Sequence, residues 1–361
     1  MKKILITGYN LDIGGIETSL INLLKSFDLN KYEITLVLEK KEGIFLSHVP
    51  ENIKVIDYDL CYSKNIFYRK IKNYLTFLRW KKHNKNKYDF SICFATHSRL
   101  GALLALTGSK NNAMWIHGNY CKCFDYDMKK LTNFFRGIKL DKFNNYVFVS
   151  HENKNETIKY YKLEGNLYVI NNIIDGDNII KKSKEKIEYE KPKKTLFVNV
   201  SRHDEVQKKI SRLIEASRRL AEDGYQFELL LVGDGKDNNF YKELVDKYKL
   251  NEVVKFVGKK ANPFPYYKLA DAIVLSSQSE GYPVVFNEAR VMNIPLITTK
   301  VSDYNDIKDK FGIVTEQEEI YIGMKQFLEQ GFAIEEKFDY TKYNQNILKE
   351  IDSIINNINV K

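Results

Sequence analysis

The chain has 361 residues, of which 43% are apolar and 29% are charged, and its formal net charge is +10 at pH 7. This length fits two domains of ordinary size, and the apolar fraction excludes a disordered or fibrous chain. The positive charge favours anionic ligands such as nucleotide diphosphates, acidic lipids or nucleic acid, without choosing between them.

The four cysteines are too few and too scattered for a disulfide-stabilised scaffold. The first residues turn polar too soon for a signal peptide. No segment approaches the roughly 20 apolar residues that a bilayer-spanning helix needs. We therefore expect a cytoplasmic protein, with peripheral contact to the inner membrane face as a further option.

Short apolar runs alternate with amphipathic segments along the first half of the chain. This alternation predicts α/β architecture with a parallel sheet. The strands predicted here are 3–7, 33–38, 54–57, 90–94, 112–116, 146–149 and 167–170, with helices at 17–26 and 99–106. Together they predict a first doubly wound domain over residues 1–176.

A polar segment rich in Lys and Glu predicts a linker over 177–194. The alternation then resumes and predicts a second doubly wound domain over 195–338. Its predicted strands are 195–200, 228–232, 253–257, 272–275 and 295–298, with helices at 211–223, 238–248, 264–269 and 284–292. The last segment, 339–361, predicts a closing helix that packs back across the first domain. Ligands of open α/β sheets bind beyond the carboxyl ends of strands, so functional residues should follow strands.

The strongest functional pattern follows the predicted strand 272–275. Glu280 lies in the loop, Gly281 and Pro283 shape a turn, and Glu288 lies one turn into the next helix. The first turn of a helix offers unpaired N–H groups and the positive end of a dipole, which suit a diphosphate. We expect Glu288 to accept hydrogen bonds from ribose hydroxyls and Glu280 to contact the hydroxyls of the transferred sugar. The donor-binding residues expected in this block are Gly281, Tyr282, Pro283, Val284, Val285 and Glu288.

Glu280 and Glu288, with seven residues between them, resemble the Glu-x7-Glu signature of retaining glycosyltransferases of family 4. Residues 292–299 resemble the continuation in that family, with Asn293 where the family usually has glycine. The resemblance implies the GT-B fold, in which two Rossmann-like domains face each other across a cleft. It also implies transfer from a nucleotide-sugar with retention of anomeric configuration.

A second pattern follows the predicted strand 195–200. Arg202 and Lys208 resemble the Gly-Arg…Lys-Gly stretch of the family, with a gap one residue longer and with Lys209 as the alternative lysine. Two fixed cations stabilise charge on a leaving diphosphate and can replace a divalent metal. We therefore expect no metal and no other cofactor. The residues expected to be catalytic are His117, Arg202, Lys208 and Glu280.

Gly14 and Gly15 lack the third glycine of a dinucleotide fingerprint, so they do not indicate NAD. They resemble the Gly-Gly loop of the family, where backbone without side chains approaches the acceptor or the donor phosphate. The alternative is that the two glycines only form a tight turn. His117, at a strand end, matches a family histidine that contacts the donor sugar, with a purely structural histidine as the alternative. Gly233 and Val257 also follow or end strands and complete the expected donor site.

Two Asp-x-Asp patterns, at 125–127 and 175–177, resemble the metal site of another glycosyltransferase fold, but neither follows a predicted strand directly. The basic segment 69–82 carries interleaved aromatic residues. It predicts either a helix on an anionic membrane surface or an ordinary surface helix with a buried apolar face.

The sequence therefore predicts a hexosyl- or N-acetylhexosaminyltransferase. A UDP-sugar is the expected donor, and the expected acceptor is a glycan, a glycolipid or an anionic polymer of bacterial surface-polysaccharide synthesis. A nucleotide-sugar epimerase and an inactive GT-B-like partner subunit remain open as alternatives. Nucleic acid is not an expected partner, because no binding module is recognisable and the basic residues are spread along the chain.

Overall fold

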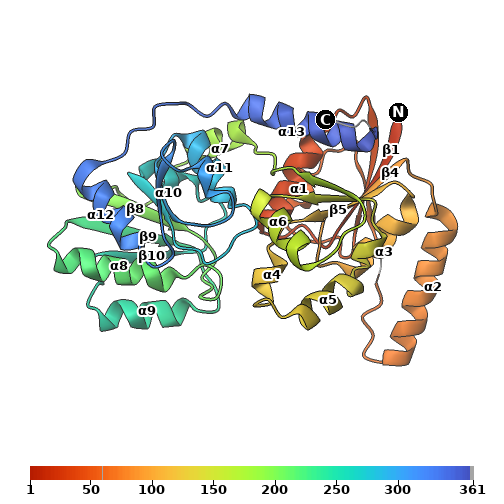
Figure 1. The fold of residues 1–361 in the computed structure, drawn as a ribbon, viewed down its shortest axis with the longest axis horizontal. Coiled ribbons are helices and arrows are strands. Elements are labelled where there is room, and N and C mark those ends of the chain that lie inside the picture. The colour runs from red at the N-terminus through yellow and green to blue at the C-terminus, as the bar shows by residue number, and fades with distance from the viewer. Residues whose placement is uncertain (59, 358–361) are drawn as a thin grey trace. The chain divides into compact units, whose positions relative to one another are not determined.

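The computed structural model describes residues 1–58 and 60–357. The chain divides into two compact units, the first comprising Met1–Ile173 with Tyr343–Lys361 and the second comprising Ile174–Lys342. Each unit is built on one parallel sheet covered by helices (Figure 1). This is the α/β architecture expected from the alternating pattern of the sequence.

The described part of the first unit contains a seven-stranded sheet in the order β3-β2-β1-β4-β5-β6-β7, and its neighbouring strands are parallel. Its strands are β1 (Lys2–Gly8), β2 (Tyr32–Leu38), β3 (Lys54–Asp57), β4 (Phe90–Cys93), β5 (Asn112–Ile116), β6 (Asn145–Phe148) and β7 (Asn166–Val169). Its helices are α1 (Gly15–Ser26), η1 (Ile44–His48), α2 (Ile66–Asn84), α3 (Arg99–Gly108), α4 (Tyr120–Cys123), α5 (Met128–Gly137), η2 (Leu140–Lys142), α6 (His151–Tyr160) and most of α13 (Tyr340–Ile355).

The second unit contains a six-stranded parallel sheet in the order β10-β9-β8-β11-β12-β13. Its strands are β8 (Thr195–Val200), β9 (Phe227–Val232), β10 (Val254–Gly258), β11 (Ala272–Leu275), β12 (Leu296–Thr299) and β13 (Gly312–Thr315). Its helices are α7 (Gly176–Lys182), α8 (Ile210–Glu222), α9 (Asn238–Lys247), α10 (Phe264–Leu269), α11 (Val284–Met292), η3 (Tyr304–Asp306) and α12 (Ile320–Gln330).

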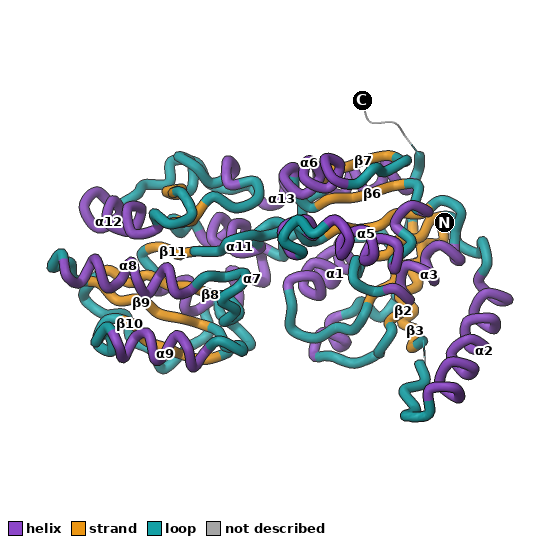
Figure 2. Tube along the Cα trace, turned by 60° about the horizontal axis from the view of Figure 1, so that its bottom comes forward, coloured by secondary structure: helices purple, strands orange, loops and turns teal. Residues whose placement is uncertain are grey.

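The core of the second unit illustrates why these segments fold as they do. Strand β9 is buried along its whole length and is apolar except for Glu228, as expected for a parallel sheet with helices on both faces. Helix α8 places Leu213, Ile214 and Leu220 against this sheet at helical spacing. Figure 2 shows α8 and α9 lying along β8, β9 and β10.

In each sheet the strand order reverses beside the first strand, between β1 and β4 in one unit and between β8 and β11 in the other. Doubly wound sheets bind ligands beyond the carboxyl ends of their strands at such a switch point. The loops that follow β8 and β11 are the ones that carry Arg202, Lys208 and Glu280. The topology therefore brings two separate sequence patterns to one edge of the second sheet.

The closing helix predicted from the sequence is α13, and it packs on the first unit. Its Asp352 accepts a hydrogen bond from the hydroxyl of Tyr32, and the ammonium of Lys2 donates to the Ile355 carbonyl at 3.4 Å. Residues 358–361 of the predicted segment lie outside the described residues.

The segment 177–194, expected to be a linker, contains most of α7, which packs against α10 and α11 of the second unit. Asp175 caps this helix by accepting from the Asn178 N–H at 3.3 Å. Of the helices in the described residues, none combines the length and apolar character that crossing a membrane requires.

Candidate functional site

The centre of the candidate site is an ion pair between Lys208 and Glu280, two of the residues predicted to be catalytic. Their Nζ and Oε1 atoms lie 2.5 Å apart, and the two side chains are only 17% and 9% exposed. The loop after β8 supplies the lysine and the loop after β11 supplies the glutamate. The structure thus brings these two predicted residues together at the switch point of the second sheet.

The loop after β8 is held by its own hydrogen bonds and by the loop after β11. Asp204 accepts, through its main-chain carbonyl, from the N–H of Lys208 at 2.8 Å. The hydroxyl of Ser276 donates to the Lys208 carbonyl at 3.0 Å, and the N–H of Gln278 donates to the Gln207 carbonyl at 2.8 Å. These bonds fix the backbone from which the lysine side chain reaches the carboxylate.

The two candidate lysines point to different partners. Lys208 pairs with Glu280, whereas the ammonium of Lys209 lies 3.4 Å from Glu205. Lys209 also has a left-handed backbone, with φ of 50°, where it precedes helix α8. This geometry favours Lys208 as the lysine of the predicted site.

Arg202 lies in the same loop, but its side chain is 65% exposed. Its guanidinium donates to the Gln207 side-chain oxygen at 3.0 Å and lies 4.0 Å from the Asp204 carboxylate. It contacts neither Lys208 nor Glu280 directly. Because most of its side chain is exposed, an anion that approaches from solvent can reach the guanidinium.

Glu288 lies one turn into α11, and its Oε2 accepts a hydrogen bond from the Tyr267 hydroxyl at 2.6 Å. Burial raises the pKa of Glu288 above its ordinary value, and the bond from Tyr267 offsets part of that rise. The other carboxylate oxygen makes no hydrogen bond to the described residues. This oxygen is left to accept a hydrogen bond from a ligand.

The turn before α11 exposes backbone rather than side chains. Pro283 is the N-cap of α11, and no side chain caps the first N–H groups of this helix, which begins with Val284 and Val285. Such groups suit an anion. Tyr282 instead points inward, where its hydroxyl lies 3.1 Å from the Asp306 carboxylate. A contact between Tyr282 and a donor would therefore use its main chain, as at Gly281.

Gly233 has a packing reason to be glycine. Its φ is 155°, and a Cβ atom there would lie 1.8 Å from the carbonyl oxygen of Ser201. Its N–H donates to the Gly258 carbonyl at 3.0 Å. A side chain at this position would collide with the loop after β8, and the donor contact expected of Gly233 stays a prediction. Val257 is half-buried at a β-bulge between Phe256 and Gly258.

In the first unit, His117 follows β5. Burial lowers its pKa to about 3, so it is neutral at physiological pH. Its ring packs on Phe94 with centroids 4.5 Å apart, and its buried Nε2 has no hydrogen-bond partner among the described residues. Gly14 and Gly15 precede and begin α1, whose N-terminus has no side-chain cap. Each of these residues lies at the carboxyl edge of the first sheet, as predicted.

Within the described residues, no group of three or more His, Cys, Asp or Glu side chains has an arrangement that holds a metal ion. The two Asp-x-Asp patterns have structural roles. Asp127 caps α5 by accepting from the N–H groups of Lys129 and Lys130, both at 3.0 Å, and Asp175 caps α7.

The sequence interpretation missed two residues that support the site. Tyr267 binds Glu288, and no pattern links positions 21 residues apart. Arg212, in the first turn of α8, is 9% exposed and donates to the Ser276 carbonyl at 3.2 Å and to the Gln278 side chain at 2.6 Å. Its place directly after the basic loop was the only available signal.

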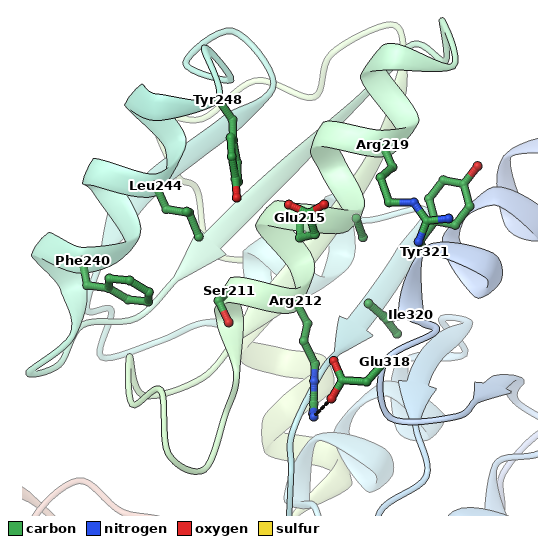
Figure 3. A pocket seen from close by; sticks show the side chains of 11 residues that line it. Ser211, Arg212, Glu215, Arg219, Phe240, Leu244, Tyr248, Glu318, Ile320 and Tyr321 are labelled. Carbon is green, nitrogen blue, oxygen red and sulfur yellow. Dashed lines mark hydrogen bonds and ion pairs between the residues drawn. The ribbon is translucent and has the colours of Figure 1, made fainter.

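Arg212 also lines a surface pocket of about 360 Å³ between α8, α9 and α12. Figure 3 shows Arg212 beside Glu318 at one end of the pocket and Tyr248 and Phe240 at α9. None of the predicted site residues is among the residues that line it. The pocket is thus separate from the predicted donor site.

Residues 179–345 match the family model of glycosyl transferases group 1. An uncharacterized glycosyltransferase of Methanocaldococcus jannaschii is 28% identical over 219 residues, which are 59% of this chain and 53% of that protein. An amylovoran biosynthesis glycosyltransferase of Erwinia amylovora is 31% identical over 113 residues, 31% of this chain and 32% of that protein. The matches thus span about half or less of these curated relatives.

Among solved structures, HepE of Anabaena in complex with UDP has a TM-score of 0.75 at 18% identity, over 98% of this chain and all of that chain. Similarity at this identity establishes the fold. The chain has the GT-B fold, with two Rossmann-like parallel-sheet units, which confirms the predicted fold class. Its second unit is related to group 1 glycosyltransferases, and the narrower assignment to family 4 stays a prediction.

Proposed function

We propose that this chain is a retaining glycosyltransferase that moves a hexosyl or N-acetylhexosaminyl group from a nucleotide-sugar to an acceptor hydroxyl. The observation that carries this proposal is the buried pair of Lys208 and Glu280 at the switch point, beside an uncapped helix N-terminus. The cation and the free N–H groups suit the two phosphates of such a donor, and the carboxylate suits its sugar hydroxyls.

In the proposed reaction, the bond between the anomeric carbon and the diphosphate oxygen breaks. The acceptor oxygen bonds to the same face of that carbon, and its proton passes to the leaving phosphate. Arg202 and Lys208 would stabilise the negative charge that develops on the leaving group, without a metal ion. Glu288 would hold the ribose through its free carboxylate oxygen. His117 would contact the donor sugar as a neutral imidazole, in keeping with its lowered pKa.

The identity of donor and acceptor is part of the proposal. HepE was solved in complex with UDP, which supports a UDP-sugar as the donor. The relative from Erwinia amylovora is named for amylovoran biosynthesis, which supports a glycan acceptor in bacterial surface-polysaccharide synthesis. The net charge of +10 would also attract a glycolipid with an anionic headgroup or an anionic polymer as acceptor. We place the protein in the cytoplasm, working at the inner membrane face.

The test measures binding of UDP, GDP and ADP, and nucleotide release from the corresponding sugars, in the presence of EDTA. We expect one nucleotide to bind and its sugar to be hydrolysed slowly without metal. Glu288→Ala should weaken nucleotide binding, and Lys208→Ala should mainly lower turnover. Lys247→Ala, which removes an exposed cation at the end of α9, is the control that should change neither.

The alternatives give different results in the same assay. Full activity in both site variants would contradict the site assignment. Conversion of the donor sugar to its epimer without any acceptor would indicate an epimerase. Absence of nucleotide binding across the panel would indicate an inactive partner subunit.

A further inference from the structure

Helix α2 (Ile66–Asn84) is unusual in its charge. The 19-residue helix contains no Asp or Glu. Its cationic side chains are Arg69, Lys70, Lys72, Arg79, Lys81 and Lys82. Surface helices of soluble proteins ordinarily carry charges of both signs, so a helix with six cations and no acidic residue presents a positive local field.

One stripe of α2 attaches the helix to the first unit. Phe77 and Trp80 pack on the core cluster that includes Tyr58, with the rings of Tyr58 and Trp80 6.2 Å apart. Asn73 accepts from the Cys61 N–H at 2.8 Å and donates to its carbonyl at 3.2 Å. Figure 2 shows the helix at the edge of this unit near β3. This stripe is the inward face of the helix.

A second apolar stripe faces solvent. Phe67 is 81% exposed, Ile71 60%, Tyr74 62%, Leu75 58% and Leu78 40%. At about 100° per residue these positions share one face, rotated by roughly 130° from the inward stripe. Single exposed apolar residues are ordinary, but a continuous row over three turns marks a surface that meets another apolar phase.

Cations border this outward stripe on both sides. By the same helical spacing, Lys70 and Lys81 lie along one border, and Lys72 and Arg79 lie along the other. Long cationic side chains extend their charge away from an apolar surface while their stems cover it. An apolar row bordered by cations is the pattern of a helix that lies in the plane of an anionic lipid surface.

We propose that the outward face of α2 is the membrane-docking surface of this protein, with anionic lipid as its partner. Phe67, Ile71 and Leu75 enter the boundary between headgroups and acyl chains, and the bordering cations contact lipid phosphates. A second copy of the chain is a poor partner, because pairing two such helices would set cations against cations. The inference specifies the surface behind the proposed membrane association and does not depend on the transfer reaction.

The experiment is sedimentation of the full chain with vesicles of phosphatidylcholine alone or with 30% phosphatidylglycerol. We expect binding to the anionic vesicles, little binding to the neutral ones, and loss of binding at high salt. Phe67→Ser/Ile71→Ser should abolish most of the binding. Lys70→Gln/Arg79→Gln should lower the partition coefficient by roughly 25-fold, at about fivefold per cation.

A matched pair, Lys242→Gln/Lys247→Gln, removes the same charge from the exposed face of α9 in the second unit. It should bind lipid as the unmodified protein does, and equal weakening by both pairs would overturn the assignment to α2. Failure of the unmodified protein to bind anionic vesicles would also overturn it. So would a concentration-dependent dimer that is lost in Phe67→Ser/Ile71→Ser while lipid binding persists.

UDP binding and thermal unfolding, measured on every variant, separate this inference from the proposed function. Because Phe67 and Ile71 are exposed, their replacement should leave the unfolding midpoint and nucleotide binding unchanged. Lipid binding without any nucleotide binding would uphold the docking surface and contradict the transferase proposal. Nucleotide binding without lipid binding would support the transferase proposal and contradict the docking surface.

Discussion

The pair of Lys208 and Glu280 should be energetically coupled, and a double-mutant cycle measures the coupling. Lys208→Met keeps the aliphatic stem but leaves a carboxylate that is only 9% exposed without its cation. Removing one partner of a buried pair costs about 3–5 kcal/mol. Because the lysine side chain is still 17% exposed, water can solvate part of the site, and we expect about 2–3 kcal/mol.

Glu280→Gln should destabilise the second unit by a similar amount, because it leaves a buried ammonium without its counter-charge. The double variant Lys208→Met/Glu280→Gln has no charge at either position. Its loss of unfolding free energy should therefore be smaller than the sum of the two single losses by about 1–3 kcal/mol. Lys209→Met is the control. Its pair with Glu205 is 35% and 24% exposed, so its loss should cost less than about 1 kcal/mol.

Hydrogen exchange on peptides covering β8 to α8 and β11 to α11 reports the stability of the second unit directly. Both tryptophans, Trp80 and Trp115, lie in the first unit. Tryptophan fluorescence during urea unfolding therefore shows whether a variant also affects that unit. Additivity of the two single effects within about 0.5 kcal/mol would refute the coupled pair.

Three further predictions concern stability. Gly233→Ala should destabilise the second unit far more than Gly224→Ala in thermal unfolding. Both glycines have positive φ, but only at Gly233 would the added Cβ collide with a carbonyl, that of Ser201. Burial raises the pKa of Glu288, so its contribution to stability is present at low pH and is lost as pH rises above the ordinary glutamate pKa. In Glu288→Gln, the free energy of unfolding measured by urea titration should therefore fall less over this pH range. Burial lowers the pKa of His117 to about 3, so stability should fall between pH 6.5 and 3, and its NMR ring signals should not titrate above pH 5.

The sequence predicted the strands well because parallel strands buried on both faces form short, uninterrupted apolar runs. The predicted bounds of β3, β5, β8 and β11 match the structure. Strand β13 (Gly312–Thr315), at one edge of the second sheet, was missed. Helix α6 was missed as well. It buries Asn153 and Thr157, so a search for apolar periodicity finds nothing there.

The sequence also predicted that Arg202, Lys208 and Glu280 follow strands of the second sheet, and the structure has them there because strand ends and topology fix where loops meet. It did not predict which side chains touch. The pairing of Lys208 with Glu280 spans 72 residues, and the role of Tyr267 depends on the packing of α10 against α11. Gly233 was predicted to allow close approach of a ligand, and its lack of a side chain also allows the loop after β9 to pack against the loop after β8, which the sequence did not predict. Such contacts are set by tertiary structure, which spacing along the chain does not encode.

The two carboxylates of the Glu-x7-Glu pair are held in different ways, and the difference suits different tasks. Glu280 is neutralised by Lys208, which is itself a proposed ligand of the diphosphate. In the proposed reaction, a lysine that turned toward a donor phosphate would leave the carboxylate with less counter-charge, which would make it a stronger acceptor for sugar hydroxyls. Glu288 is held by the hydroxyl of Tyr267, which stabilises its charged form, but burial raises the free energy of that form by more. A ribose hydroxyl that donates to its free oxygen would stabilise that charge, so a bound donor would supply hydrogen-bond donors to both carboxylates in the proposed site.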